Sequence, residues 1–285
     1  MESAISYRLG IAVGGTFTDL VLVDDRKKTF HVAKVQSTAP DPSLGVISGI
    51  KRLSEKAKID PRDICALMHG TTVATNAVLT GDGARVGLVT TAGYRYVLQI
   101  ARSFIPGGLG AWVNFNKKPP LAPLFLTIEA DERVDAGGHI ITPLDEEKLI
   151  RDIRRLRDKG IDALAISLIH SYANDTHEKR VAELAAQELA GIPISLSSQV
   201  VPEMQEYERT ITTVANSYVR PAVERYVENF SRELRDICGD VKLHILRSDG
   251  GLTSTRGACS APVNLLMSGP AGGETAVSLR VEEGG

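Results

Sequence analysis

The stretch that decides the fold is residues 7–36, YRLGIAVGGTFTDLVLVDDRKKTFHVAKVQ. Its first part, Tyr7–Val13, is apolar and ends at two glycines, after which Thr18–Val23 resumes with β-branched and apolar residues. A polar turn, Asp24–Lys28, precedes Thr29–Val35, in which apolar and polar residues alternate. Runs of this length and composition, separated by turn residues, are typical of strands. The stretch therefore predicts three consecutive strands.

Helix and strand alternate after this meander. Apolar residues recur at helical spacing after Pro42–Ser43, which suits a helix start. Ile64–Met68 is predicted to be a buried strand, followed by a helix over Val73–Leu79 and a strand over Arg85–Thr90. Three strands, then a helix and a strand, resemble a ribonuclease H-like α/β unit in their order. We therefore expect the first domain to have that fold.

The middle of the chain continues the alternation. A helix is expected to start with Thr142 as N-cap and Pro143 at its first position. Leu164–Ile169 and Ile194–Leu196 are predicted strands, and Thr176–Leu189 between them is a predicted helix. Such alternation favours a parallel sheet.

A long helix is predicted after Glu203. Apolar residues recur there every three or four positions, and the stripe that includes Tyr226 is most simply explained by core packing. Pro221 should kink or restart the helix. This change of pattern places a domain boundary near residue 200, which gives one domain over 1–200 and the start of another over 201–285.

Composition excludes several classes of protein. The net charge of −2 and the pI of about 6.3 give no sign of nucleic-acid binding or of a basic membrane contact. The cysteines are far apart, without metal-ligand spacing, and are expected to be reduced thiols: Cys65, Cys238 and Cys259. We see no signal peptide and no apolar run of about 18 residues. These observations predict a cytoplasmic protein that contacts neither membrane nor nucleic acid.

The turn between the first two strands carries the strongest chemical signal. Gly14 and Gly15 let the backbone turn tightly and approach a ligand without a Cβ clash. Amides in such a turn point at phosphate oxygens, and the hydroxyls of Thr16 and Thr18 add donors. Asp19 is placed to hold a metal-bound water beside a phosphate. The alternative is a plain hairpin turn.

A second motif, His69-Gly70-Thr71-Thr72, lies where a strand end meets a helix start. Free amides and the helix dipole favour an anion at such a place. His69, Thr71, Thr72 and Asn76 are therefore candidate ligand contacts. Two alternatives stay open: Thr71 or Thr72 as a helix cap, and His69 as a satisfied core histidine.

Four other segments give weaker indications of function. Glu206–Arg209 is most simply explained as a charged helix face with local ion pairs, and the alternative is a functional role. Ser248–Gly251 and Ser268–Gly273 are Gly-rich loops that either face a cleft or simply turn. Ser103–Pro123 is a long excursion rich in Gly and Pro, of a length that is often functional.

Six motifs occur in order across nearly the whole chain: GGTFTD, HGTTVATNA, DERVDAGGHIITPLDE, LIHSYANDTHEKRVAEL, EYERTITTVANSYVRP and SGPAGG. Together they resemble the hydantoinase A/5-oxoprolinase family. The resemblance implies an actin-like ATPase fold and the use of ATP with Mg²⁺ to activate the oxygen of a small carbonyl or cyclic amide substrate. Its chemistry is phosphoryl transfer, in which positioning and electrostatics supply most of the catalysis. The implied partners are a hydantoinase B-type subunit and a full-length hydantoinase A-type subunit.

The same resemblance assigns roles to the two motifs. The first phosphate loop supplies the cofactor side: Gly14, Gly15, Thr16 and Thr18. The second motif supplies contacts to substrate or to the γ-phosphate: His69, Thr71, Thr72 and Asn76. Asp19 is the expected catalytic residue, and no residue is expected to ligate a metal directly.

The sequence departs from the family pattern in ways that leave two functions open. Ala12 occupies a position where the family has an acid near the metal, and the residues end before a second phosphate loop. We therefore expect the first domain and the start of a second α/β domain, without the second ATPase half. One reading is the N-terminal portion of a subunit of an ATP-dependent hydantoinase, oxoprolinase or ketone carboxylase; the alternative is a degenerate, non-catalytic structural or regulatory subunit.

Two milder differences bear on the branch of the family. Asp249 stands where Asn is expected in the family's Ser-Asn-Gly-Gly, a change that still suits a turn. The segment Pro106–Trp112 resembles the ketone (acetophenone) carboxylase branch more than the hydantoinases, so it favours a carboxylase complex.

Overall fold

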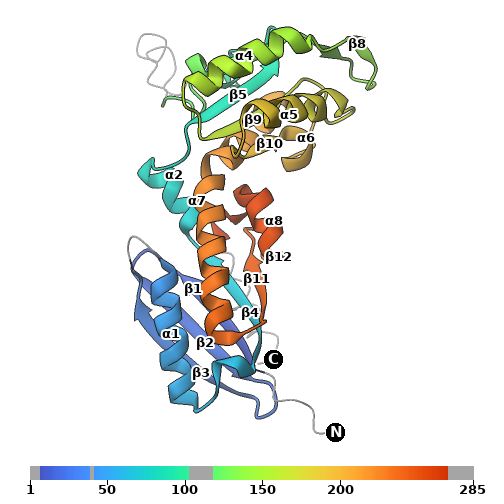
Figure 1. Ribbon diagram of the computed structural model, residues 1–285. Coiled ribbons are helices and arrows are strands. Elements are labelled where there is room, and N and C mark those ends of the chain that lie inside the picture. Colours follow the sequence, from blue (N-terminus) through green and yellow to red (C-terminus); the bar gives the residue numbers. More distant parts are fainter. Residues whose placement is uncertain (1–6, 39–41, 103–117, 269–285) are drawn as a thin grey trace, which may run out of the picture. The chain divides into compact units, whose positions relative to one another are not determined.

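The chain folds as two compact units in this computed structural model, which describes residues 7–38, 42–102 and 118–268 (Figure 1). Unit 1 comprises residues 1–82 and 222–285, and unit 2 comprises residues 83–221. Unit 2 is therefore inserted into the sequence of unit 1. The two units do not divide near residue 200, because the chain returns to the sheet of unit 1 after residue 222. The domain boundary near residue 200 concerns the domains of the family and stays a prediction.

The sheet of unit 1 has six strands in the order β12-β11-β4-β1-β2-β3. Their bounds are β1 Tyr7–Val13, β2 Phe17–Asp24, β3 Thr29–Gln36, β4 Ile64–Thr71, β11 Lys242–Leu246 and β12 Leu252–Ser254. Strands β1, β2 and β3 pair antiparallel, whereas β4 joins β1 and β11 joins β4 in parallel. The α/β fold is confirmed, and this order is the one expected of a ribonuclease H-like sheet.

Two of the helices of unit 1, α1 and α7, pack on one face of this sheet. The helices of unit 1 are α1 Pro42–Ala57, α2 Val73–Thr80, α8 Thr255–Ser260 and the last part of α7, with two short 3₁₀ helices, Pro61–Asp63 and Pro262–Leu265. Alternate residues of β1, such as Leu9, are buried against Ile50 of α1 and Phe230 of α7. Burying each such side chain contributes about 1.5–3 kcal/mol, so the period-2 pattern fixes which face becomes the core.

Unit 2 is a parallel four-stranded sheet in the order β10-β9-β5-β6, as predicted. Its elements are β5 Val86–Thr91, β6 Thr127–Ala130, β9 Ala163–Ser167, β10 Ile194–Leu196, the hairpin β7 Arg133–Val134 with β8 Ile140–Thr142, the helices α3 Val97–Ile100, α4 Glu146–Asp158, α5 Thr176–Glu188 and α6 Ser197–Val200, and the 3₁₀ helix Leu124–Leu126. Leu149, Ile153 and Leu156 of α4 are buried in its core.

The start of α4 differs from the prediction. Thr142 is the last residue of β8, where it pairs with Arg133 and so cannot cap a helix. Asp145 is the N-cap instead, and its carboxylate accepts a hydrogen bond of 3.0 Å from the Lys148 amide.

The long helix α7, Glu206–Cys238, runs through Pro221 without a restart. Its first part belongs to unit 2 and its last part to unit 1, and the division between the units falls directly after Pro221. None of the helices in the described ranges combines the length and the apolar character needed to cross a lipid bilayer.

The local ion pairs predicted for the charged helix face at Glu206–Arg209 are not the ones that Arg209 and Glu208 make. Its side chain is buried, with 1% of its surface exposed, and donates hydrogen bonds to the Ser197 hydroxyl and to the carbonyl oxygen of Leu168. Glu208 pairs with Arg102, more than one hundred residues away in sequence, and not with a helix neighbour. Helical spacing shows which residues share a face, but not whether a partner segment covers that face.

Candidate functional site

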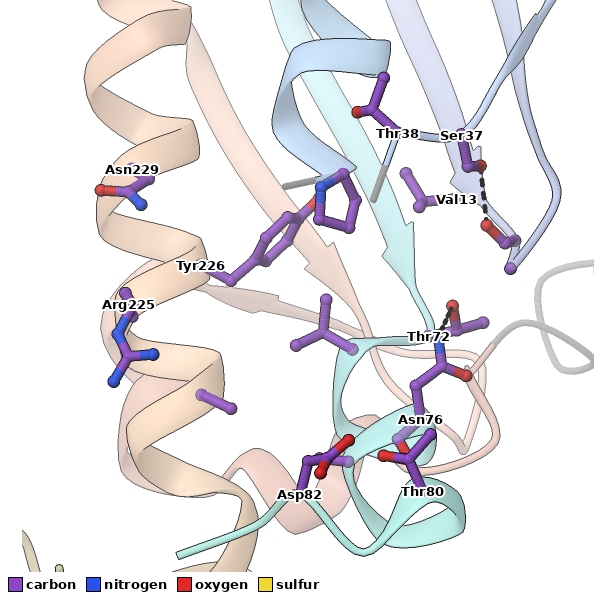
Figure 2. A pocket seen from close by; sticks show the side chains of 16 residues that line it. Val13, Ser37, Thr38, Thr72, Asn76, Thr80, Asp82, Arg225, Tyr226 and Asn229 are labelled. Carbon is purple, nitrogen blue, oxygen red and sulfur yellow. Dashed lines mark hydrogen bonds between the residues drawn. The ribbon is translucent and has the colours of Figure 1, made fainter. Parts of the chain in front are cut away.

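A cavity of about 620 Å³ lies in unit 1, where the β1–β2 turn, the start of α2 and the helix α7 meet (Figure 2). Gly14 and Gly15 form part of one wall, and Thr72 and Asn76 of α2 form another. The α7 wall is polar and aromatic: Arg225, Tyr226 and Asn229. The two motifs that the sequence singled out therefore meet at one cavity.

The β1–β2 turn is held rigidly on its inner side. The Gly14 amide donates to the carbonyl of Phe17 at 2.9 Å, and the Ser37 hydroxyl donates to the carbonyl of Gly14 at 2.8 Å. A Cβ on Gly14 would lie 3.1 Å from the Phe17 oxygen, whereas a Cβ on Gly15 would meet nothing within 4 Å. Neither glycine has a positive φ. Gly15 thus leaves bare backbone facing open space, as an approaching phosphate requires.

The hydrogen bonds at the start of α2 show whether Thr71 or Thr72 caps this helix. Thr72 is at the N-cap position but makes no side-chain capping bond; its hydroxyl accepts from the Asn76 amide group at 3.3 Å. The buried Thr71 hydroxyl instead accepts from the Val73 amide at 3.3 Å. Figure 2 shows Thr72 and Asn76 side by side on the cavity wall. Thr71 therefore has a structural partner, and Thr72 and Asn76 face the cavity.

The other candidates of the first motif do not line the cavity. Thr18 is fully buried, with its hydroxyl 3.0 Å from that of Ser37, so it supports the turn from behind. Asp19 forms an ion pair of 3.1 Å with Lys34, and about half of its side chain is exposed. Thr16 accepts a backbone hydrogen bond from Ser37. Only Gly14 and Gly15 of this motif border the cavity directly.

Ala12 and Asp19 lie side by side on the other face of the sheet. They are register partners across β1 and β2, and Ala12 is exposed while its neighbours Ile11 and Val13 are buried. Gly70 is the register partner of Ala12 on β4. An acid at position 12 would therefore stand directly beside the Asp19 carboxylate.

His69 is a core residue, as the plainer interpretation had it. It has no exposed surface, and burial lowers its pKa to about 3. Its Nε2 atom lies 2.8 Å from the hydroxyl of Tyr226, which lines the cavity. His69 thus touches a cavity residue without reaching the cavity itself.

The sequence pattern does not predict the α7 wall. Arg225, Tyr226 and Asn229 have the i, i+1, i+4 spacing of one helix side, but the apolar stripe predicts core packing for Tyr226 and includes neither Arg225 nor Asn229. Arg225 is exposed, and among the described residues it makes no ion pair. A cation without a partner beside a Gly-rich turn is the signal that would have indicated an anion site.

The remaining Gly-rich loops are accounted for only in part. Ser248–Gly251 forms the turn between β11 and β12, with Gly250 at φ +80° and the Asp249 carboxylate accepting from the Gly251 amide at 3.0 Å. Ser268 donates to the carbonyl of Thr71 at 3.1 Å. Gly269–Gly273 and Pro106–Trp112 lie outside the described residues.

Comparisons with known proteins extend over both units. The model of the hydantoinase/oxoprolinase N-terminal region matches residues 8–189, and the hydantoinase/oxoprolinase model matches residues 209–284. Among relatives, the alpha subunit of caprolactamase from Pseudomonas jessenii is 31% identical over 93% of this chain. The gamma subunit of acetophenone carboxylase from Aromatoleum aromaticum is 32% identical over 76% of it.

The fold agrees with a solved relative. The nucleotide-free structure of acetone carboxylase, an enzyme of ATP-dependent acetone carboxylation, matches 96% of this chain with a TM-score of 0.86 and 25% identity. The chain spans 40% of that structure's chain, and 38% and 31% of the two relatives above. With family models matching most of its residues, this chain belongs to the hydantoinase/oxoprolinase family.

Proposed function

We propose that this chain supplies the first phosphate-binding wall of an ATP-dependent enzyme that phosphorylates a carbonyl or amide oxygen of a small substrate. The observation that carries the proposal is the bare backbone of Gly15 beside Thr72, Asn76 and Arg225 around one cavity. Amides, hydroxyls and a guanidinium are the donors that phosphate oxygens accept. Membership of the family is the reason to expect this chemistry. In the proposal, the chain acts in the cytoplasm together with a hydantoinase B-type subunit and a full-length A-type subunit.

The residues fit a nucleotide phosphate better than they fit a bare metal ion. Within the described ranges, no three His, Cys, Asp or Glu side chains gather to hold a metal. Mg²⁺ in phosphoryl-transfer sites needs only one or two carboxylates besides phosphates and waters, and Asp19 is the carboxylate on the strand that leaves the turn. In the proposed site Gly14, Gly15, Thr72 and Asn76 contact phosphate or substrate. Asp19 would have to leave its ion pair with Lys34 to orient a metal-bound water, so this role rests on the family resemblance and not on the geometry of the cavity.

The direct test places a methyl group on the bare backbone. Gly15→Ala removes no internal contact, so the chain should fold normally while ATP binding by calorimetry weakens about tenfold, a loss of about 1.4 kcal/mol. Gly10→Ala is the matched control on β1, the strand that leads into the turn, because its Cβ would meet only the Val21 oxygen, at 3.9 Å, and Gly10 does not line the cavity. Equal binding by wild type and Gly15→Ala would refute the phosphate wall.

One observation favours the second function, a non-catalytic subunit. Ala12 leaves Asp19 as the single carboxylate of the Ala12–Asp19 pair, so Mg²⁺ has fewer ligands there. Ala12→Asp restores a pair of carboxylates, and we expect Mg²⁺-dependent ATP binding and phosphate release to rise if the site is a lapsed ATPase. Unchanged phosphate release with Ala12→Asp, in the presence of both partner subunits, would favour the structural role.

A further inference from the structure

The cavity of unit 1 is lined by one acid among the described residues, Asp82, and by one base, Arg225. Asp82 follows α2 in sequence and Arg225 belongs to α7, as Figure 2 shows. Both side chains are exposed, and within the described ranges neither of them forms an ion pair. The cavity therefore offers charges of both signs to a ligand.

Thr80, the last residue of α2, adds an oxygen atom two residues before Asp82. It lines the cavity, and its hydroxyl donates to the carbonyl oxygen of Asn76 at 2.9 Å. Because a hydroxyl has one proton and two lone pairs, the Thr80 oxygen keeps its acceptor capacity. Asn76, one turn earlier, donates its side-chain amide group to the Thr72 hydroxyl at 3.3 Å. This end of the α2 wall thus presents acceptors, and Asp82 gives it a negative charge.

The polarity of α2 favours a cation at the same end. The helix ends at Thr80 and is followed by Gly81 at φ +79°. The last four carbonyl groups of a helix lack partners within the helix, and the helix dipole makes this end negative. Thr72, at the opposite end of α2, has the polarity that favours an anion. Along this one wall the preference therefore changes from anion to cation.

Oxygen atoms are the ligands that hard divalent cations take, and Mg²⁺ bound with a phosphate needs only one or two carboxylates besides phosphate and water oxygens. Asp82 lines the cavity without an ion pair, whereas Asp19 is paired with Lys34 and lies off the cavity wall. We therefore propose that Asp82, together with the Thr80 hydroxyl, binds the divalent cation that accompanies the phosphate ligand. The phosphate rests on the proposed function, whereas the cation site does not.

The cation site can be tested without any phosphate. Mn²⁺ takes the same oxygen ligands as Mg²⁺, and because it is paramagnetic it broadens the NMR signals of nearby amides. In the ¹⁵N-labelled full chain we expect the amides of Gly81 and Asp82 to broaden at the lowest Mn²⁺ concentrations, and excess Mg²⁺ to restore them. Asp82→Asn should abolish this selective broadening. Its absence from the wild type, its survival in Asp82→Asn, or broadening centred on Asp19 would overturn the proposal.

The coupling between cation and phosphate is tested with inorganic pyrophosphate, titrated calorimetrically at constant ionic strength with and without Mg²⁺. Without Mg²⁺, Asp82→Asn removes a negative charge from the cavity and should bind pyrophosphate at least as tightly as the wild type. With Mg²⁺, Asp82→Asn should bind it about tenfold more weakly than the wild type. Asp63→Asn is the matched control, because Asp63 is an exposed acid of unit 1 that does not line the cavity. It should follow the wild type under both conditions.

The outcomes separate this cation site from the proposed function. If Asp82→Asn and Asp63→Asn respond alike to Mg²⁺, Asp82 acts only through the net charge, and the cation site is overturned while the phosphate site remains. If the wild-type chain binds neither pyrophosphate nor ATP, the proposed function fails, and the Mn²⁺ spectra still decide whether Asp82 binds a cation.

Discussion

The carboxyl edge of the unit 2 sheet and the cavity of unit 1 both collect polar groups at strand ends, but they use them differently. In unit 2, Glu132 accepts hydrogen bonds from the Thr91 hydroxyl and, at 2.7 Å, from Nδ1 of His177. Glu178 likewise accepts from the Leu168 amide at 3.0 Å and from the Ser197 hydroxyl at 2.6 Å. These groups satisfy one another, so the edge where open α/β sheets usually bind ligands is internally bonded here.

At the unit 1 cavity some lining groups are also bonded to one another, such as Thr72 and Asn76, but two lining groups differ from those of unit 2. Gly15 contributes bare backbone, and Arg225 contributes a charge without an ion pair among the described residues. Two arginines of helix α7 show the difference: the side chain of Arg209 is buried, with 1% of its surface exposed, whereas that of Arg225 is exposed. Buried polar groups need partners, so a satisfied network stabilises a fold, whereas unpartnered exposed donors are available to a ligand. The comparison therefore supports the cavity of unit 1 as the proposed ligand site.

The largest expected effect is on the stability of unit 2. Arg209→Ala removes the donors to Ser197, Leu168 and Glu203 and leaves the Glu178 carboxylate without its nearby positive charge. Breaking such a buried charged network should lower the free energy of unfolding by about 3–5 kcal/mol. Urea titration, with hydrogen exchange of the β9 amides reporting on unit 2, measures the loss. A loss below about 1 kcal/mol would mean that the network does not stabilise the unit.

The next effect concerns pH and the core of unit 1. The folded pKa of His69 is about 3, below the ordinary 6.5, so the unfolded chain binds an extra proton between these values. The contribution of neutral His69 is complete above pH 6.5 and is lost toward pH 3, at up to about 1.4 kcal/mol per pH unit. His69→Gln should remove that slope from the pH dependence of urea unfolding. Parallel curves for the variant and the wild type would show that His69 is not buried as a neutral ring.

The smallest effect is the one most specific to the cavity. Arg225→Ala should leave unfolding within about 0.5 kcal/mol of wild type, because the side chain is exposed, yet weaken pyrophosphate binding about tenfold. Arg235→Ala is the matched control: it removes the same charge from the same helix, is exposed, and does not line the cavity. If both variants weaken binding equally, Arg225 acts only through the net charge and not at the cavity.

Local pattern was sufficient for most of the secondary structure. The alternation in β1, β2 and β3 and the helical period of α1 and α4 predicted these elements within a few residues, since period and turn chemistry are properties of neighbouring residues. The exception, Thr142 as a cap, failed because strand pairing with Arg133 outweighed a local capping signal.

By itself, the sequence determined the order of elements, the family motifs and the Gly14–Gly15 turn. Only the tertiary structure decided which of those residues share a cavity: it brought Tyr226 to His69, set Arg209 inside unit 2, and turned Asp19 toward Lys34 and away from the cavity wall. The physical reason is that a repeat of 2 or 3.6 residues fixes the face on which a side chain lies, whereas its partner is chosen by segments far away in sequence that pack against that face.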